Sequence, residues 1–328
     1  MSGRRRTVLV TGGAGFIGSG LARLLAERDW RVRIVDDLSV GRRAYLAGVP
    51  HQLIEASLAD RRAVAGAVEG TAAIVHLAAR ASVPDSVSDP LGTFEVNVTQ
   101  TLGLLEAARA AGVRRFVFAS SSAAAGNHEP PIDESVLPHP ISPYGASKLA
   151  GEAFCQAYAA AFGIAACALR FSNVYGPRSL HKSSVVANWF RAALAGRPVI
   201  IYGDGEQSRD LIHVDDISLA ILAALERPAD AVAGEIFQVG TGRETTMNAL
   251  AGTIERIVGR PLEIARAPAR AGDIRRHVSG VDKAAQRLGF RAEVALEDGL
   301  RRTADWLAQA LQVPDLAAIG VDSTSGSD

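Results

Sequence analysis

The chain has 328 residues, of which 48% are hydrophobic, so it can bury a large core. Lys and Arg together number 35, and Asp and Glu also number 35, so no strong field favours nucleic acid or an anionic membrane as a partner. Two cysteines exclude a disulfide scaffold and are typical of a reducing compartment. We expect a cytoplasmic protein with no membrane span and, because its histidines are scattered, no metal site.

The first predicted strand, Thr7–Thr11, is a β-branched run typical of a strand buried on both faces. A turn containing Gly12, Gly15 and Gly18 follows at once, and apolar residues at helical spacing come next. Strand, glycine turn and helix together predict a dinucleotide site, with the pyrophosphate at the helix N-terminus. The alternative is that the glycines only form a tight turn.

The second predicted strand, Arg31–Asp36, ends in an acidic residue 18 positions after Gly18. An acid at about this distance binds the adenosine ribose and repels a 2′-phosphate, so Asp36 favours NAD over NADP. NADP remains an alternative because either Arg42 or Arg43 could reach its 2′-phosphate.

Strands and helices alternate along the first half of the chain. Further strands are predicted at His51–Glu55, Ala73–His76, 116–120 and 165–169, and helices at 91–111 and 144–162. This alternation predicts an α/β fold: a Rossmann-type, doubly wound parallel sheet, with ligands beyond the carboxyl ends of the strands.

The pattern becomes irregular after residue 170. Helices are predicted at Val185–Leu194, 215–225, 246–258, 282–288 and 296–311, and strands at 211–214 and Ile236–Val239. We therefore expect an NAD-binding domain at 1–170 with returns near 211–240, a smaller, interleaved C-terminal substrate domain at 171–313, and a disordered tail at 314–328.

Tyr144 and Lys148 are four residues apart, which places both side chains on one face of a helix. A phenol, with a pKa of about 10, is a poor base at neutral pH. A neighbouring ammonium and a positive nicotinamide ring lower that pKa. Ser120, Ser121 and Ser122 end a predicted strand, where a hydroxyl can relay a proton to Tyr144. The alternatives are that Tyr144 and Lys148 are an unrelated surface pair and that the serines only cap a turn.

Seven segments carry a resemblance to a known family: TGGAGFIGS, VDDLS, HLAARASV, FASSSAAAG, SPYGASK, LRFSNVYGPR and GDGEQSRDLIHVDD. Together they resemble the extended short-chain dehydrogenases/reductases, in particular the NAD-dependent epimerase/dehydratase group typified by UDP-glucose 4-epimerase. The resemblance implies NAD as cofactor, a UDP-sugar as substrate and a homodimer formed by helices 91–111 and 144–162. Leu104, Leu105, Phe154 and Tyr158 are the apolar positions expected on the outer face of that pair, and packing on the sheet is the alternative for many of them.

The resemblance also assigns roles by motif. It implies that Tyr144 is the catalytic base, Lys148 its partner, and Ser121, five residues before Gly126, the catalytic hydroxyl. The expected contacts to NAD are Gly12, Gly15, Phe16, Ile17, Gly18, Asp36, Asp37, Ser39, Ser57, Leu58, Leu77, Ala78, Ala79, Asn97, Ser120, Tyr144, Lys148 and Phe171. The expected contacts to the substrate are Ala81, Ser82, Ser121, Ser122, Asn173, Val185, Ile200, Arg209, Arg270, Asp273 and His277.

The residues after the catalytic hydroxyl bear on the reaction. Dehydratases and decarboxylases of this family carry an acid where this chain has Ser122 and Ala123, so the sequence favours 4-epimerisation through a 4-keto sugar with return of the hydride. A dehydratase, decarboxylase or reductase of the same family and a non-catalytic NAD-binding protein are the alternatives.

The sugar is less determined. In the family, the position of His277 gates the sugar pocket, and Ala81 and Ser82 resemble enzymes that take 2-acetamido sugars. A uronate carboxylate suits the many cations of the second half, Arg178, His181, Lys182, Arg275, Arg276 and His277. UDP-glucuronate and UDP-N-acetylglucosamine are therefore both open, ahead of UDP-glucose.

Overall fold

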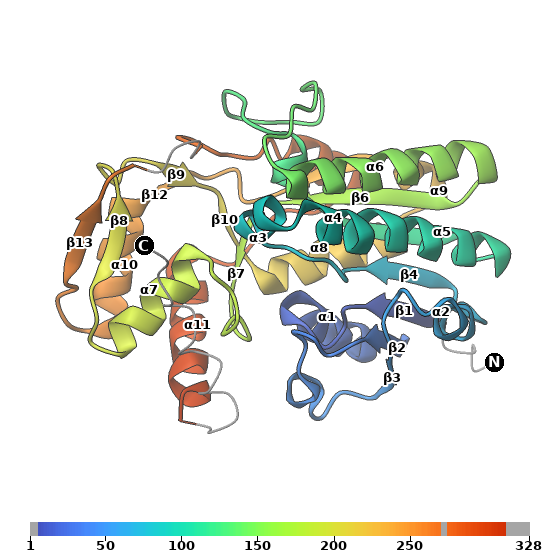
Figure 1. Ribbon diagram of the computed structural model, residues 1–328, viewed down its shortest axis with the longest axis horizontal. Helices are drawn as coiled ribbons and strands as arrows, with labels where there is room; N and C mark the ends of the chain where they lie inside the picture. Colours follow the sequence, from blue (N-terminus) through green and yellow to red (C-terminus); the bar gives the residue numbers. More distant parts are fainter. Residues whose placement is uncertain (1–5, 270–273, 313–328) are drawn as a thin grey trace.

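The computed structural model describes residues 6–269 and 274–312. Its centre is a seven-stranded parallel sheet with the strand order β11-β6-β5-β4-β1-β2-β3 (Figure 1). The strands are β1 (Thr7–Thr11), β2 (Arg31–Asp36), β3 (His51–Glu55), β4 (Ala73–His76), β5 (Arg115–Ser121), β6 (Ala165–Phe171) and β11 (Ile236–Val239). The predicted Rossmann-type sheet is confirmed.

Helices cover both faces of this sheet, because its strands present apolar side chains alternately to the two sides. In β1, Val8 and Val10 join one core cluster, and Leu9 joins the other. The first cluster includes α1 (Phe16–Glu27), α8 (Val214–Glu226) and α9 (Ala229–Val232), and the second includes α2 (Arg61–Val68), α5 (Gln100–Ala110) and α6 (Pro143–Phe162).

The strand order reverses between β1 and β4, which pair side by side although β2 and β3 lie between them in the chain. Crossovers leave β1 toward opposite edges of the sheet at this point, so a crevice opens beyond the carboxyl ends of β1 and β4.

A second lobe contains α7 (Val185–Leu194), α10 (Met247–Val258) and α11 (Leu296–Ala310) around its own core (Figure 1, left). Three two-stranded sheets accompany it: β8 (Val199–Tyr202) with β13 (Ile264–Ala267), β9 (Ser208–Arg209) with β12 (Thr245–Thr246), and β7 (Asn173–Tyr175) with β10 (Leu211–His213). Most of these strands were not predicted, because they are two to four residues long and their partners are distant in sequence.

One predicted helix is interrupted. The segment 91–111 forms α4 (Pro90–Phe94), a π-helical turn η2 (Glu95–Thr99) and α5. A single continuous helix was therefore wrong. Such π turns occur often at functional sites, and this one carries Asn97. The shorter elements are η1 (Arg43–Leu46), α3 (Val83–Ser88), η3 (Ser122–Ala124) and a second π turn, η4 (Ala284–Leu288), where a helix 282–288 was predicted.

The expected outer face of the helix pair was also wrong. Leu104, Leu105 and Tyr158 are 1%, 0% and 7% exposed and belong to the core between α5, α6 and the sheet. In the part of the chain that the structure describes, no helix is long and apolar enough to cross a membrane.

Candidate active site

A cavity of about 940 Å³ lies at the carboxyl end of the sheet, within the size range of small-molecule sites. It is lined from the sheet side by Ser120, Ser121, Tyr144, Lys148 and Phe171, and from the second lobe by Asn173, Val185, Ile200 and Arg209. A smaller crevice of about 210 Å³ adjoins it. The crevice is lined by the residues predicted to hold NAD, namely Gly12, Gly15, Phe16, Ile17, Gly18, Asp36, Asp37, Ser39, Ser57, Leu58, Leu77, Ala78 and Ala79.

The glycine turn has no room for side chains. Gly12 has φ +67°, and a Cβ there would lie 2.9 Å from the Ala78 nitrogen. A Cβ on Gly18 would lie 2.3 Å from the Gly12 carbonyl oxygen. Helix α1 begins after Gly15 without a side-chain cap, so its first N–H groups remain available to an anion. This geometry fits the diphosphate of a dinucleotide.

Asp36 ends β2 and lines the crevice. Its carboxylate accepts hydrogen bonds from the backbone nitrogens of Ala14 and Leu38, each at 2.9 Å. Burial raises the pKa of Asp36 above its ordinary value of 3.8, and the two N–H bonds oppose that shift. Arg43, one of the two arginines that kept NADP open, forms an ion pair with Glu55. Asp36 is thus fixed where an adenosine ribose is expected.

The catalytic candidates come from two neighbouring elements. Ser121 is the last residue of β5, and α6 begins at Pro143, where Ser142 caps the helix by accepting a bond from the Gly145 nitrogen at 3.1 Å. Lys148 donates from Nζ to the Ala119 carbonyl at 2.8 Å, and Nζ lies 5.9 Å from the centre of the Tyr144 ring. The local spacing and the strand pairing bring Ser121, Tyr144 and Lys148 to one cavity.

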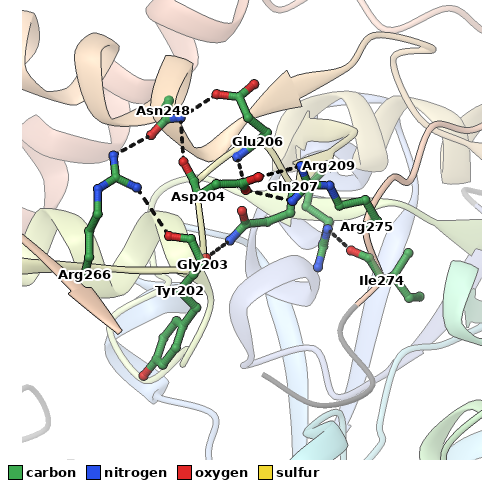
Figure 2. A network of polar contacts seen from close by, with 10 residues as sticks. All are labelled: Tyr202, Gly203, Asp204, Glu206, Gln207, Arg209, Asn248, Arg266, Ile274 and Arg275. Carbon is green, nitrogen blue, oxygen red and sulfur yellow. Dashed lines mark hydrogen bonds and ion pairs between the residues drawn. The ribbon is translucent and has the colours of Figure 1, made fainter. Parts of the chain in front are cut away.

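The opposite wall is formed by the loop before and through β9. Arg209 donates from Nη1 to the Ser208 carbonyl at 2.8 Å. It also donates to the Ile274 carbonyl at 2.7 Å, and Gln207 donates to the Tyr202 carbonyl at 2.7 Å (Figure 2). Asp204 receives both arms of Arg275 at 2.7 Å each. Polar contacts therefore hold a guanidinium at the cavity wall, where it can meet a phosphate.

The model of the "NAD dependent epimerase/dehydratase family" matches residues 8–240. The chain belongs to this family. The enzyme resembles the crystal structure of UDP-glucose 4-epimerase with UDP-glucose from Thermotoga maritima, with 37% identity, a TM-score of 0.88, and coverage of 93% of this chain and 99% of that one. It therefore belongs to the UDP-sugar 4-epimerase group, with NAD as its cofactor.

Two further solved structures name other sugars. One is a UDP-N-acetylglucosamine 4-epimerase from Methanobrevibacter ruminantium in complex with UDP-N-acetylmuramic acid (32% identity, TM-score 0.88, 93% of this chain and 99% of that one). The other is a UDP-glucuronic acid 4-epimerase from Bacillus cereus in complex with UDP-glucuronic acid and NAD (28% identity, TM-score 0.86, 92% and 99%). The likeness thus extends across three sugar types.

Burial works against ionisation of the Tyr144 phenol. It raises the pKa of Tyr144 above its ordinary value of 10, and a hydrogen bond with Ser121 opposes this. The lowering expected from the ammonium of Lys148 and from the positive nicotinamide ring of NAD stays a prediction.

Asn97, expected to contact NAD, is 1% exposed and lies behind the cavity wall. Its side-chain oxygen accepts from the Arg80 nitrogen (2.8 Å), and its amide donates to the Arg80 carbonyl and to Ser147 Oγ, both at 3.0 Å. In the described residues it ties the loop after β4 to α6. Its contact with NAD stays a prediction.

Three of the predicted substrate residues do not line the cavity. Ser82 caps α3 by accepting from the Asp85 nitrogen (3.2 Å) and, like Ser122 and the 3%-exposed His277, does not line the cavity. A role of His277 in sugar choice stays a prediction. Arg270 and Asp273 lie outside the described residues, as does the tail 314–328.

The sequence analysis missed several residues that line the large cavity, including Trp189, Tyr202 and Gln207. Gln207 stands within the GDGEQSRD segment, beside the assigned Arg209, so that segment was the available signal. The aromatic residues gave no local signal, because their position depends on how α7 and β8 pack. Among residues 6–269 and 274–312, no group of three metal-ligating side chains is present.

Proposed function

We propose that the enzyme interconverts the C4 epimers of a UDP-hexose through a 4-keto intermediate. The supporting observation is that Ser121, Tyr144 and Lys148 share one cavity wall beside a crevice that fits NAD. When bound, NAD supplies the hydride acceptor and donor. The residue types suit proton movement at the sugar C4 oxygen, which is all that the protein must add.

Each catalytic side chain has one task in this proposal. Tyr144 takes the proton of the C4 hydroxyl, and Ser121 hydrogen-bonds the same oxygen and the phenol. Lys148 favours the phenolate by its charge. Ala123, in η3 directly after β5, has no carboxylate to remove a C5 proton, so elimination of water is disfavoured.

The UDP moiety is proposed to bind at Arg209 and Asn173, where two segments of the second lobe meet the cavity. Arg270 and Asp273 are proposed to complete this binding. Holding the diphosphate firmly leaves the hexose free to present either face of its ketone, since the binding energy is concentrated away from the reacting carbon.

We infer that the hexose is a uronate. Among the cations of the second half, some are paired with carboxylates, whereas Lys182 is placed where it could meet a carboxylate of the substrate. Arg275 pairs with Asp204 and Arg276 with Glu244, both at 2.7 Å. Lys182 has no carboxylate partner within the described part of the chain. It lines both the cavity and the crevice, and no other charged described residue does so. Burial lowers its pKa, and a carboxylate on the sugar would offset the cost of burying this charge.

A second candidate is UDP-N-acetylglucosamine. Ala81 also lines both the cavity and the crevice, and its methyl side chain leaves space for an N-acetyl group. The two candidates therefore rest on different residues, which can be varied separately.

The test is a panel of UDP-glucuronate, UDP-N-acetylglucosamine and UDP-glucose, with the C4 configuration of each product read by NMR. UDP-glucuronate is expected to have the highest kcat/KM. Lys182→Met should lower that value about tenfold, the order expected when a charged hydrogen bond is lost, and should leave UDP-glucose little changed. Lys283→Met is the control, since Lys283 pairs with Glu235 at 2.9 Å outside the cavity. Equal losses for all sugars would remove Lys182 from sugar choice, and no epimer of any sugar would contradict the proposed reaction.

The enzyme is proposed to be a homodimer, through a face that differs from the expected one. Leu91 and Phe94 of α4 are 81% and 55% exposed, and Val87 of α3 is 64% exposed. A cluster of large exposed apolar side chains favours a protein contact. Leu91→Asp should shift the sedimentation coefficient to that of a monomer. Ile264→Asp, an equally apolar exposed position on β13, should not.

A further inference from the structure

A buried ion pair joins helix α6 to strand β6. Glu152 in α6 follows Lys148 by one helical turn, and Arg170 in β6 precedes Phe171 of the cavity wall. Glu152 is 0% exposed and Arg170 1%. Arg170 donates from Nε and Nη2 to the two carboxylate oxygens at 2.8 Å each, and Ser120 Oγ donates to Oε1 at 2.5 Å. A fully buried pair gains little stability over an apolar core, so its position beside Lys148 calls for a role.

The packing of α6 against β5 buries most of Lys148. A Cβ on Gly151 would lie 2.3 Å from the Phe118 ring, so helix and strand are in close contact. Lys148 is 4% exposed, and Nζ lies 4.9 Å from the centre of the Phe118 ring. Burial lowers the pKa of Lys148 to about 8, and the negative charge of Glu152 opposes this.

Few other charges face Lys148. From α6 these are Tyr144 and Glu152, and from β4 it is His76, whose pKa burial lowers to about 3, so that the imidazole is neutral. From β6 comes Arg170, through Glu152. Strand β5 contributes only uncharged groups, the Ala119 carbonyl and the Phe118 ring.

The charges of this cluster decide which groups can be ionised. Glu152 neutralises Arg170, so protonated Lys148 is left as the net buried positive charge next to Tyr144. Without the carboxylate, two cations would share one buried region. A guanidinium does not lose its proton in proteins, so the lysine would lose its own.

We propose that Glu152 and Arg170 are positioning residues that keep Lys148 protonated beneath Tyr144. Glu152 supplies the negative charge, and Arg170 together with Ser120 fixes the carboxylate one turn from the ammonium. The pair thereby acts on the phenol through Lys148 without touching the substrate. This inference rests on the proposed role of Lys148 in proton transfer, so its test is chosen to need no turnover.

The experiment uses the fact that the chain has three lysines, Lys148, Lys182 and Lys283. NAD-loaded protein labelled with ¹³C at the lysine ε-carbons is titrated by NMR, and each lysine is assigned by its substitution. Glu152→Gln should lower the midpoint of Lys148 by about one pH unit or more, the order of shift that a close opposite charge causes. Arg170→Gln should raise it. Lys182 and Lys283 serve as internal controls that should not move.

Opposite shifts in the two variants are the decisive outcome, because loosened packing would move both in one direction. An unchanged Lys148 midpoint in Glu152→Gln, or shifts of the same sign, would overturn the proposal. Asp216→Asn is the matched control, a 0%-exposed carboxylate in α8 that accepts from the backbone nitrogens of Glu293 and Val294. It should lower the thermal midpoint and leave Lys148 unchanged. If Glu152→Gln does not fold, Arg170→Gln decides alone: no upward shift contradicts the proposal.

Discussion

The NAD crevice and the second-lobe wall of the large cavity are built differently. The NAD crevice depends on backbone geometry: a glycine turn, free N–H groups at the start of α1, and Asp36 held by two backbone nitrogens. The second-lobe wall of the cavity, where UDP is proposed to bind, carries the charged Arg209. Next to Arg209 lies the Asp204–Arg275 pair, whose side chains are 55% and 60% exposed (Figure 2). Steric geometry is insensitive to salt, whereas exposed charges are screened by it. Binding of NAD should therefore withstand ionic strength better than binding of UDP.

The largest effect is expected at Tyr144, on the sheet side of the cavity. Tyr144→Phe removes the proton acceptor and should lower kcat by about a thousandfold, within the range for loss of a general base. Bound NAD, measured by its absorbance after release, and the Kd of UDP, measured by calorimetry, should both stay near wild type. Retention of most activity would refute the role of Tyr144 as base.

The next largest effect is expected in the glycine turn that lines the NAD crevice. Gly18→Ala places a Cβ 2.3 Å from the Gly12 carbonyl and 2.6 Å from the Gly13 Cα, so the turn must move. We expect a destabilisation of about 2 kcal/mol or more and loss of bound NAD. Gly66→Ala in α2 is the control, because its Cβ would meet nothing within 4 Å. Chemical denaturation and the NAD content of the purified protein measure both effects, and full NAD occupancy in Gly18→Ala would contradict the steric argument.

Substitution of Arg209 on the second-lobe wall should give a smaller effect, confined to the binding of UDP. Arg209→Ala removes the guanidinium from the cavity wall and should raise the Kd of UDP about tenfold, as for loss of a charged hydrogen bond. NAD content should not change. The difference from wild type should narrow as salt is raised. An unchanged Kd at low salt would place the diphosphate elsewhere.

The smallest effect is expected at the rim of that wall. Arg275→Gln breaks an exposed pair, so the Kd of UDP should change by less than about twofold. Arg275 holds the pKa of Asp204 below its ordinary 3.8. The contribution of the pair is therefore present at neutral pH and is lost progressively as the pH falls from about 4 toward the lowered pKa of Asp204. Thermal midpoints of wild type and variant should thus differ slightly at pH 7, and this difference should shrink steadily as the pH falls below about 4.

The sequence analysis was most successful where the signal is local. The glycine turn follows from sterics within one βα unit, and the spacing of Tyr144 and Lys148 follows from one helix. It failed where a face had to be assigned. Leu104 and Tyr158 were expected outside and lie in the core, because helical periodicity does not say which side meets the sheet. The apolar residues left exposed are Leu91 and Phe94, before the π turn.

The amino-acid sequence by itself determined the Rossmann-type sheet, the family and the cofactor, and it singled out Ser121, Tyr144 and Lys148 as catalytic candidates. Each of these depends on residues close together in the chain or on recognisable motifs. Only the tertiary structure decided that Glu152 meets Arg170 and that Lys182 reaches both the cavity and the crevice. Such contacts join segments whose meeting depends on how helices and strands pack, and no short-range pattern records them. The sequence shows which residues are charged, whereas the packing of the elements determines which charged residues pair.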